Sequence, residues 1–351
     1  MRGRWGLRRC SRMGLRSEVA GISACWIRGF GLILVLALFG CAGAHSGKDG
    51  LGSSQKRARN QFSGARVLEN VRALSVQEKE GVDGCVPVSR RLRSRLGAMG
   101  ASIEGHSFAA GDAKHRATET GPSTVAFLKG FSPDPMLLIA PYTEACGDPH
   151  SGTSGLDEAA FLLELGRVLS LHPMRYSVGL VFVPEKGAPG EGQDTVGSPE
   201  ATPWPELVRV ASRLQDSGLL ERVRVAVFFD GLGVANPAAL RDSHSHPIYR
   251  EVFWESARDL DLMDLFPRDA VFASSQVGHH GLIEKGLRRT VMITMDVEVS
   301  ESGSSQADAA SHSRPRAEAF RSVGDVSVEA IQRIQKRLER IDGLSVSSEQ
   351  G

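Results

Sequence analysis

The sequence predicts an α/β protein, a three-layer domain in which helices flank a central mixed, largely parallel sheet. Two observations lead to this prediction. Short apolar runs without alternation, which are typical of strands buried on both faces, recur along the chain. Longer segments with apolar residues at helical spacing lie between these runs. Strands that alternate with helices in this way are typical of layered α/β folds.

The first half of the body supplies the elements that most favour this fold. Residues 136–140 (MLLIA) and 176–183 (YSVGLVFV) are the apolar runs, and residues 157–171 form a strongly amphipathic pattern between them. We expect, in chain order, a helix at 88–100, strands at 102–109, 123–129 and 136–140, a helix at 157–171 and a strand at 176–183.

The second half repeats the alternation. Residues 223–229 (VRVAVFF) are a third apolar run, and residues 327–341 (SVEAIQRIQKRLERI) close the chain with an amphipathic pattern. We expect a helix at 203–219, a strand at 223–229, a helix at 248–262, a strand at 289–295 and a helix at 327–341.

The 351 residues have room for one large core, and neither an internal repeat nor a clean break divides the body. We therefore predict a single domain over residues 64–343 and a disordered tail over 344–351. Two segments rich in small and polar residues, 186–202 and 300–316, are long for connections, which favours either disorder or a place at the mouth of a site.

Charge separates the start of the chain from the rest. The sequence has 42 Lys and Arg residues against 41 Asp and Glu residues, a balance that argues against a dedicated nucleic-acid partner. Residues 1–40 hold seven arginines and one acid, Glu18, so the remaining 35 basic and 40 acidic residues give the body a net charge of −5. The basic charge therefore belongs to the leader.

The leader reads as an export signal. Residues 30–40 (FGLILVLALFG) form an uncharged run that is short for a membrane span, for which about twenty apolar residues are needed. An apolar run behind an arginine-rich flank is typical of a signal peptide, and a start at Met13 would shorten that flank. The alternative interpretation is a short core helix.

The end of this run, Leu38-Phe39-Gly40-Cys41, resembles a bacterial lipobox, in which the cysteine carries the lipid (palmitate among its chains) and becomes the mature N-terminus. We therefore predict a signal peptide at 1–40 and, at 41–63, a lipidated Cys41 followed by a polar tether. The expected location is the bacterial cell envelope, anchored to a membrane through Cys41, on the periplasmic side or the surface, with the outer membrane favoured.

Two cysteines remain in the body, Cys85 and Cys146. An oxidising compartment would permit a disulfide between them, but sequence spacing alone does not establish that their Cα atoms approach. The sequence has no C-x-x-C or H-E-x-x-H motif, so neither a zinc ribbon nor a thermolysin-like helix is expected.

Several common site motifs are also absent from the sequence. It contains no G-x-S-x-G nucleophile elbow and no Walker A motif. Residues 231–236 read G-x-G-x-x-N after a strand, without the third glycine of a dinucleotide fingerprint, so a turn at the strand end is the favoured interpretation.

Five motifs follow one another in the body. They are LLIAPYT at 137–143, SGTSG at 151–155 with the helix AFLLELGRVL at 160–169, FVPEK at 182–186, FFDGLGVANP at 228–237 and QVGHHGLIEKGLR at 276–288. Their order over residues 60–343 resembles the zinc aminopeptidase and glutaminyl cyclase superfamily, especially its glutaminyl-peptide cyclotransferase branch. The resemblance implies a zinc exopeptidase-like fold. It also implies a zinc ion held by the Asp of a T-D motif, a Glu of G-E-E and the His of D-D-H.

The departures from the family motifs fall on the metal ligands. Ser154 stands where an Asp ligand is expected, and its neutral hydroxyl is a poor zinc ligand. The glutamate pair is reduced to Glu185 beside Lys186, whose ammonium would repel a dication. His279 matches the histidine ligand, whereas Pro141 replaces the histidine that the aminopeptidase branch requires. The resemblance therefore leaves His279 as the one matching zinc ligand.

Other residues are candidates for a displaced site. Ser154-x-x-Asp157 before an apolar run is favoured as a helix capping box, although Asp157 and Glu158 also lie near the expected metal. Asp230 ends a strand and is either a site residue or a turn residue. The expected components of a displaced site are Glu158, Glu185, Asp230 and His279, with Glu185 and Asp230 in catalytic roles.

The remaining histidines receive weaker interpretations. His279 and His280 are either metal ligands or solvated loop residues. His244 and His246 flank a serine before a proline and are expected at the surface.

Three functions remain open on this evidence. The favoured one is a catalytically impaired, exported lipoprotein without a cofactor that binds peptide N-termini or an envelope protein. The second is an active zinc-dependent cyclotransferase or aminopeptidase in which His279 acts with Asp157, Glu185 or Asp230. The third is a structural envelope protein.

Overall fold

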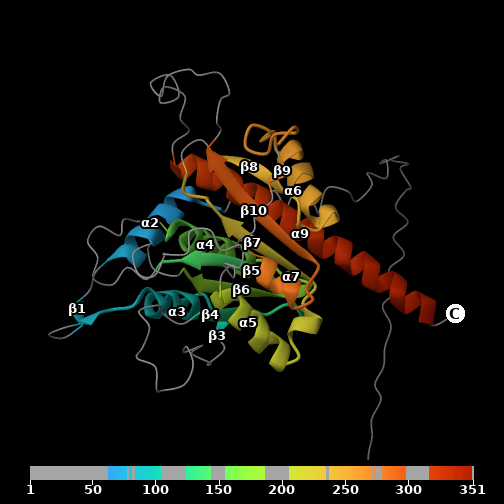
Figure 1. Ribbon diagram of the computed structural model, residues 1–351, viewed down its shortest axis with the longest axis horizontal. Coiled ribbons are helices and arrows are strands. Elements are labelled where there is room, and N and C mark those ends of the chain that lie inside the picture. The colour runs from blue at the N-terminus through green and yellow to red at the C-terminus, as the bar shows by residue number, and fades with distance from the viewer. Residues whose placement is uncertain are drawn as a thin grey trace, which may run out of the picture. The chain divides into compact units, whose positions relative to one another are not determined.

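An eight-stranded mixed sheet forms the centre of the described part of the chain in this computed structural model (Figure 1). Its strand order is β3-β4-β6-β5-β7-β10-β8-β9, and a separate hairpin pairs β1 with β2. The structure describes residues 62–76, 79–80, 84–103, 123–143, 155–185, 205–234, 237–270, 272–273, 279–297 and 316–349. The strands are β1 (Lys79–Glu80), β2 (Gly84–Cys85), β3 (Ser102–Ile103), β4 (Thr124–Leu128), β5 (Ser132–Tyr142), β6 (Tyr176–Pro184), β7 (Val225–Asp230), β8 (Pro237–Asp242), β9 (Phe272–Ala273) and β10 (Thr290–Val297).

The four central strands β6, β5, β7 and β10 run parallel to one another, whereas β4 and β8 pair antiparallel with β6 and β10. This arrangement confirms the predicted mixed α/β sheet. Because parallel strands end at the same edge, the residues that follow β5, β6 and β7 are brought together there.

Helices cover both faces of the sheet (Figure 1). One face packs against α2, α3, α4, α6 and α9, and the other packs against α5, α7 and the short 3-10 helix η1. The helices are α2 (Gly64–Ser75), α3 (Val88–Ala98), α4 (Asp157–Ser170), α5 (Pro205–Asp216), η1 (Leu220–Arg222), α6 (Pro247–Asp259), α7 (His280–Glu284) and α9 (Arg316–Glu349). Among these described helices, none combines the length and the apolar character that crossing a membrane requires.

Alternation along β5 divides the core into two layers. Met136 and Leu138 pack toward α4, whereas Leu137 and Ile139 pack toward α5. All four are at most 1% exposed, as expected for a strand covered on both faces. The apolar runs of the sequence therefore form the buried centre of the sheet.

The structure differs from the sequence prediction at several elements. Helix α2 was not predicted, and α9 spans Arg316–Glu349, so it begins before the predicted 327–341 and enters the predicted tail. Of the predicted strand at 102–109, residues 102 and 103 form β3, and the remaining residues lie outside the described part of the chain. The predicted capping box was wrong, because α4 begins at Asp157 behind Leu156, which makes no side-chain cap. Asp157 is therefore the first residue of the helix and not its third.

Helix α9 lies close to the first residue of α2 and to Phe62, which precedes α2, at two glycines. A Cβ atom on Gly64 would overlap the carbonyl oxygen of Ala317, and one on Gly324 would overlap the ring of Phe62. These contacts bring α9 against α2 at its first turns and so fix the position of Arg316 at the start of the helix.

We expect Gly64→Ala to lower the free energy of unfolding by about 2 kcal/mol, because the added methyl group meets a backbone oxygen that cannot turn away. The control is Gly343→Ala, where no atom lies within 4 Å of the added Cβ and a gain of up to about 1 kcal/mol is expected from helix propensity. Denaturant unfolding measures both variants, and equal stability of the two would contradict the close contact of α2 with α9.

Candidate functional site

The carboxyl edge of the central strands carries polar residues in a fixed arrangement. Strands β5 and β6 are in register at Tyr142 and Pro184, and the amide of Glu185 donates to the carbonyl of Tyr142 over 2.7 Å. The hydroxyl of Thr143 donates to Oε2 of Glu185 over 2.9 Å. The two residues that follow these strands are therefore held side by side.

Helix α4 adds two further carboxylates to this edge. Asp157 and Glu158 lie in its first turn, where the helix dipole favours negative charge, and they are 5% and 6% exposed. Oε1 of Glu158 accepts a hydrogen bond of 2.9 Å from the amide of Leu232, two residues after β7. This bond ties the start of α4 to the end of β7.

Two glycines allow the backbone to press against these carboxylates. Gly155 has a φ of +84°, and a Cβ there would overlap Thr143 Oγ1 and lie 3.0 Å from Glu185 Oε2. A Cβ on Gly233 would overlap Oδ2 of Asp157. The space beside both carboxylates is therefore taken up by the chain itself.

Electrostatic coupling joins four carboxylates, Asp157, Glu158, Glu185 and Asp230, which we call the acid cluster. Burial raises the pKa of Glu158 to about 7; the charges of Asp157 and Asp230 add to this rise, and backbone N–H groups oppose it. Burial likewise raises the pKa of Asp230, together with the charge of Glu185 and against a hydrogen bond from the amide of Gly231. Groups that titrate near neutral pH are suited to proton transfer.

Arg316 is the cationic partner of the acid cluster. Its guanidinium forms a hydrogen-bonded ion pair with Asp157 and lies 5.6 Å from the centre of the Phe320 ring, one turn along α9. Burial raises the pKa of Asp157, and Arg316 opposes that rise. Among the described residues, no other cationic side chain is paired with a carboxylate of the cluster.

His279 does not join the acid cluster. It lies at the start of α7 with none of its surface exposed, and its Nε2 is 3.3 Å from Oδ2 of Asp242 at the end of β8. Burial raises the pKa of Asp242, but His279 and the hydroxyl of Ser245, 2.7 Å away, outweigh burial and lower it. The side chains of His279 and Asp242 are thus within ion-pair distance, although neither ring nitrogen of His279 makes a hydrogen bond to a described residue.

Two further histidines, His244 and His280, lie near His279 and Asp242. His244 stacks edge-on against His280 with ring centres 4.4 Å apart, and His280 is 5.7 Å from the ring of His279. Burial lowers the pKa of His280, and the neighbouring histidines lower it further. His246 packs instead against Tyr249.

A zinc ion, which the family resemblance of the sequence implies, does not fit the described residues. Among them, no group of three or more His, Cys, Asp or Glu side chains is arranged to hold a metal ion. His279 lies within 3.3 Å of Asp242, and one oxygen each of Asp157, Glu158 and Glu185 accepts a hydrogen bond from Arg316, Leu232 and Thr143, respectively. The sequence departs from the ligand motifs of the family at Ser154, Lys186 and Pro141. Ser154 and Lys186 lie outside the described residues, whereas Pro141 is buried within β5.

The cysteine predictions also fall outside what the structure describes. Cys41 and Cys146 are not among the described residues, and Cys85 is described only as part of strand β2. The lipidation and the disulfide therefore stay predictions.

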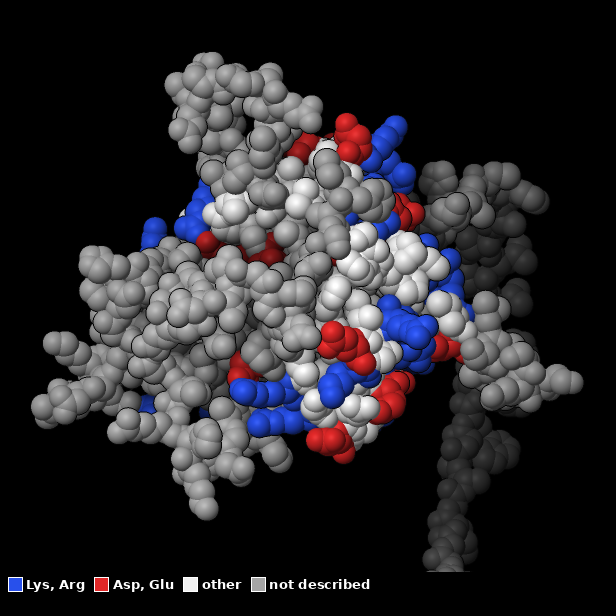
Figure 2. All heavy atoms as spheres, viewed as in Figure 1, with Lys and Arg blue, Asp and Glu red and all other residues white. Residues whose placement is uncertain are grey.

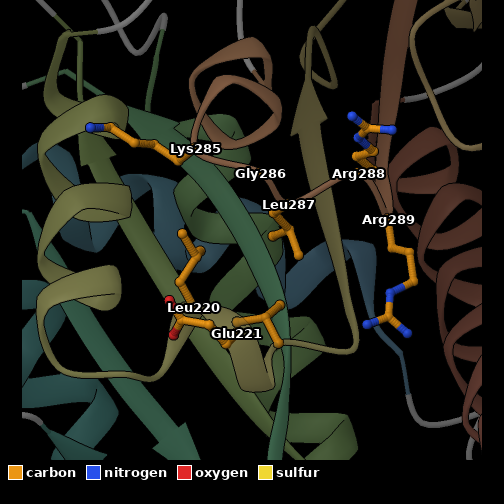
Figure 3. A pocket seen from close by; sticks show the side chains of 8 residues that line it. Leu220, Glu221, Lys285, Gly286, Leu287, Arg288 and Arg289 are labelled. Atoms are coloured by element: carbon orange, nitrogen blue, oxygen red, sulfur yellow. The ribbon is translucent and has the colours of Figure 1, made fainter.

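A cavity of about 350 Å³ lies at the opposite edge of the sheet, between η1 and the turn into β10 (Figure 3). Figure 3 shows Leu220, Glu221 and Leu287 around one space, while Lys285, Arg288 and Arg289 extend in different directions. The basic side chains therefore do not converge on one point. Over the described face in Figure 2, acidic and basic side chains are interspersed, without a broad patch of either sign.

Comparison with solved structures identifies the fold. A glutaminyl cyclase from an Acidobacteriales bacterium matches with a TM-score of 0.56 at 17% identity, over 79% of this chain and 96% of that one. A leucine aminopeptidase precursor from Bacteroides thetaiotaomicron gives a TM-score of 0.55 at 17% identity, over 77% and 97%. The chain has the glutaminyl cyclase and zinc exopeptidase fold. This confirms the family resemblance at the level of fold.

A Porphyromonas gingivalis glutaminyl cyclase also matches, with a TM-score of 0.57 at 15% identity, over 78% of this chain and 99% of that one. No family model and no curated sequence matches the chain. The likeness therefore rests on the backbone, and the chemistry has to be argued from the side chains of this chain.

Sequence reasoning missed three residues of these sites. Thr143 and Asp242 each follow or end a strand, so their position was a usable signal. Arg316 gives no such signal, because its pairing with Asp157 spans 159 residues.

We expect Glu158→Gln to raise stability at pH 8 by about 1–3 kcal/mol, because the amide removes a buried charge and can still accept from Leu232. A folded pKa of about 7, above the unfolded value of 4.5, means that this residue lowers stability as pH rises from about 4.5 to 7. The difference between variant and wild type should therefore vanish below pH 4.5.

Urea unfolding from pH 4 to 8 measures this difference. Glu255→Gln, which changes an exposed carboxylate on α6, is the control and should show no such dependence on pH. A constant difference between Glu158→Gln and wild type across this range would contradict a buried titration of Glu158.

Proposed function

We propose that the protein is an exported lipoprotein whose glutaminyl cyclase-like domain is catalytically impaired and binds the N-terminal end of a peptide or an envelope protein. The observation that carries this proposal is the separation of His279 from the acid cluster. His279 is paired with Asp242, while Glu158, Glu185 and Asp157 bind Leu232, Thr143 and Arg316.

These contacts supply what a metal ion would otherwise supply to the carboxylates. A zinc site needs about four ligands that converge on one point, with lone pairs free for the ion. Here one oxygen each of Glu158, Glu185 and Asp157 already accepts a hydrogen bond from a backbone, hydroxyl or guanidinium donor of the chain, and the described side chains do not converge on one point. The impairment is therefore a property of the whole arrangement and not of one missing ligand.

A peptide end suits the same edge of the sheet. An N-terminal ammonium is a cation. The carboxylates of the acid cluster, at the carboxyl ends of β6 and β7, would compensate its charge. The raised pKa of Glu158, about 7, favours the alternative function of an active zinc-dependent cyclotransferase or aminopeptidase, because such a carboxyl could transfer protons near neutral pH.

Export and anchoring complete the proposal. The arginine-rich segment, the apolar run at 30–40 and Cys41 support a lipid anchor on the chain, with the domain held at the cell envelope by residues 41–63. Labelling the expressing bacterium with a radioactive or clickable fatty acid tests this part, with Cys41→Ser as the variant that should lose the label.

Zinc content tests the impaired site. The full chain, extracted in detergent, incubated with zinc and washed, should hold far less than one zinc per chain by mass spectrometry. It should not cyclise peptides with N-terminal glutamine. About one zinc per chain, lost in His279→Ala, would overturn the proposal and favour the active enzyme.

Restoring the most obvious ligand should not restore activity. In Ser154→Asp we expect neither zinc binding nor cyclisation, because His279 remains paired with Asp242 and Lys186 still stands beside Glu185. The measurement is ammonia release from a glutaminyl peptide. Activity in this single variant would contradict an impairment spread over several residues.

A further inference from the structure

We propose that the acid cluster is a cation site whose resident cation is the guanidinium of Arg316, and that its ligand class is a guanidinium or ammonium group instead of a zinc ion. This inference rests on the proposed function and names the chemistry by which the domain would hold a peptide end. The disagreement between the fold and the described metal ligands is its starting point.

The first step is the charge balance. Four carboxylates are coupled in a chain, Asp157 with Glu158, Glu158 with Asp230, and Asp230 with Glu185. Among the described residues, Arg316 is the cationic side chain that pairs with this group. A buried carboxylate is costly without a partner, so a positive charge at this place stabilises the fold.

The second step is the contact itself. Nη2 of Arg316 bonds Oδ2 of Asp157, which is 5% exposed, and Oδ1 of the same carboxylate is buried without a hydrogen-bond partner among the described residues. One carboxylate oxygen is thus left with an unused acceptor. The carboxylate of Asp157 can therefore accept more hydrogen bonds than Arg316 donates.

The third step is how Arg316 is held. The residue is the first of α9, its side chain is 40% exposed, and the Phe320 ring lies 5.6 Å from its guanidinium. Its helix is fixed against α2 at Gly64 and Gly324. A side chain that is bound at its tip and partly open to solvent can be displaced by an incoming cation without unfolding α9.

Two properties favour an organic cation over a metal ion. Among the described residues, the carboxylates of the cluster do not form a group of three or more that could hold a metal ion, and one oxygen each of Glu158 and Glu185 is already bonded to the Leu232 amide and the Thr143 hydroxyl. Guanidinium and ammonium groups need single hydrogen bonds and one compensating charge, which Asp157 supplies. Arginine side chains and free peptide N-termini carry these groups.

The test removes the resident cation and supplies it from solution. Arg316→Ala should lower the thermal midpoint of the full chain by about 3–6 °C, and low-millimolar methylguanidinium should recover most of that loss. Arg316→Lys should stay close to wild type. Arg321→Ala, on the same helix and exposed, is the matched control and should neither lose stability nor respond to methylguanidinium.

A second variant pair keeps the test decisive if Arg316→Ala folds poorly. In Arg316→Ala with Asp157→Asn, the carboxylate charge is gone, so the protein should be more stable than Arg316→Ala and should not respond to methylguanidinium. Equal responses of the double variant and of Arg316→Ala, or no response of either, would overturn the inference.

Zinc separates this inference from the proposed function. Stabilisation of Arg316→Ala by zinc but not by methylguanidinium would overturn the assigned ligand class while leaving a zinc-free wild type intact. Zinc bound at one per chain by the wild type would instead overturn the proposed function. A zinc-free wild type together with recovery of Arg316→Ala by methylguanidinium supports both.

Discussion

The burial of helix α4 is the constraint on which the rest of the site depends. Twelve of its fourteen residues are buried, because the sheet covers one side of the helix and α2 and α9 cover the other. A helix enclosed in this way cannot turn its first residues toward solvent. Asp157 and Glu158 therefore lie in the interior, at the carboxyl edge of β5, β6 and β7. Burying two carboxylates costs free energy, and the other polar contacts at this edge reduce that cost.

Several different local interactions compensate the buried carboxylates of α4. The N-terminal dipole of α4 favours both charges, the amide of Leu232 satisfies Glu158, and Arg316 satisfies one oxygen of Asp157. Glu164, further along the same helix, is compensated in the same way, because its carboxylate accepts hydrogen bonds from the amide of Ser63 and from Arg167. Each buried acid of α4 therefore accepts at least one hydrogen bond from a donor of the chain itself.

The sequence predicted the centre of this fold well and its edges poorly. Strands such as β6 and β7 consist mostly of apolar residues without alternation, so burial on both faces could be predicted from the sequence. Helix α2 was missed because its pattern is short and mixed, and α9 was predicted too short because Arg316 begins a stretch whose burial comes from distant packing. The pairing of His279 with Asp242 and of Arg316 with Asp157 connects residues far apart in the chain. Spacing rules carry no information about such pairs.

The acid cluster lies at one edge of the sheet, apart from most of the hydrophobic packing of the fold. The hydrophobic layers on the two faces of the sheet are complete without the carboxyl edge, so substitutions at that edge alter charge more than packing. Donors of the chain compensate the carboxylates at that edge, such as Thr143 beside Glu185 and the first residue of α9 beside Asp157. A further acid placed there would increase the repulsion within the cluster. The same arrangement keeps negative charge at the carboxyl edge of the sheet, and Arg316 is the cationic side chain that pairs with it among the described residues.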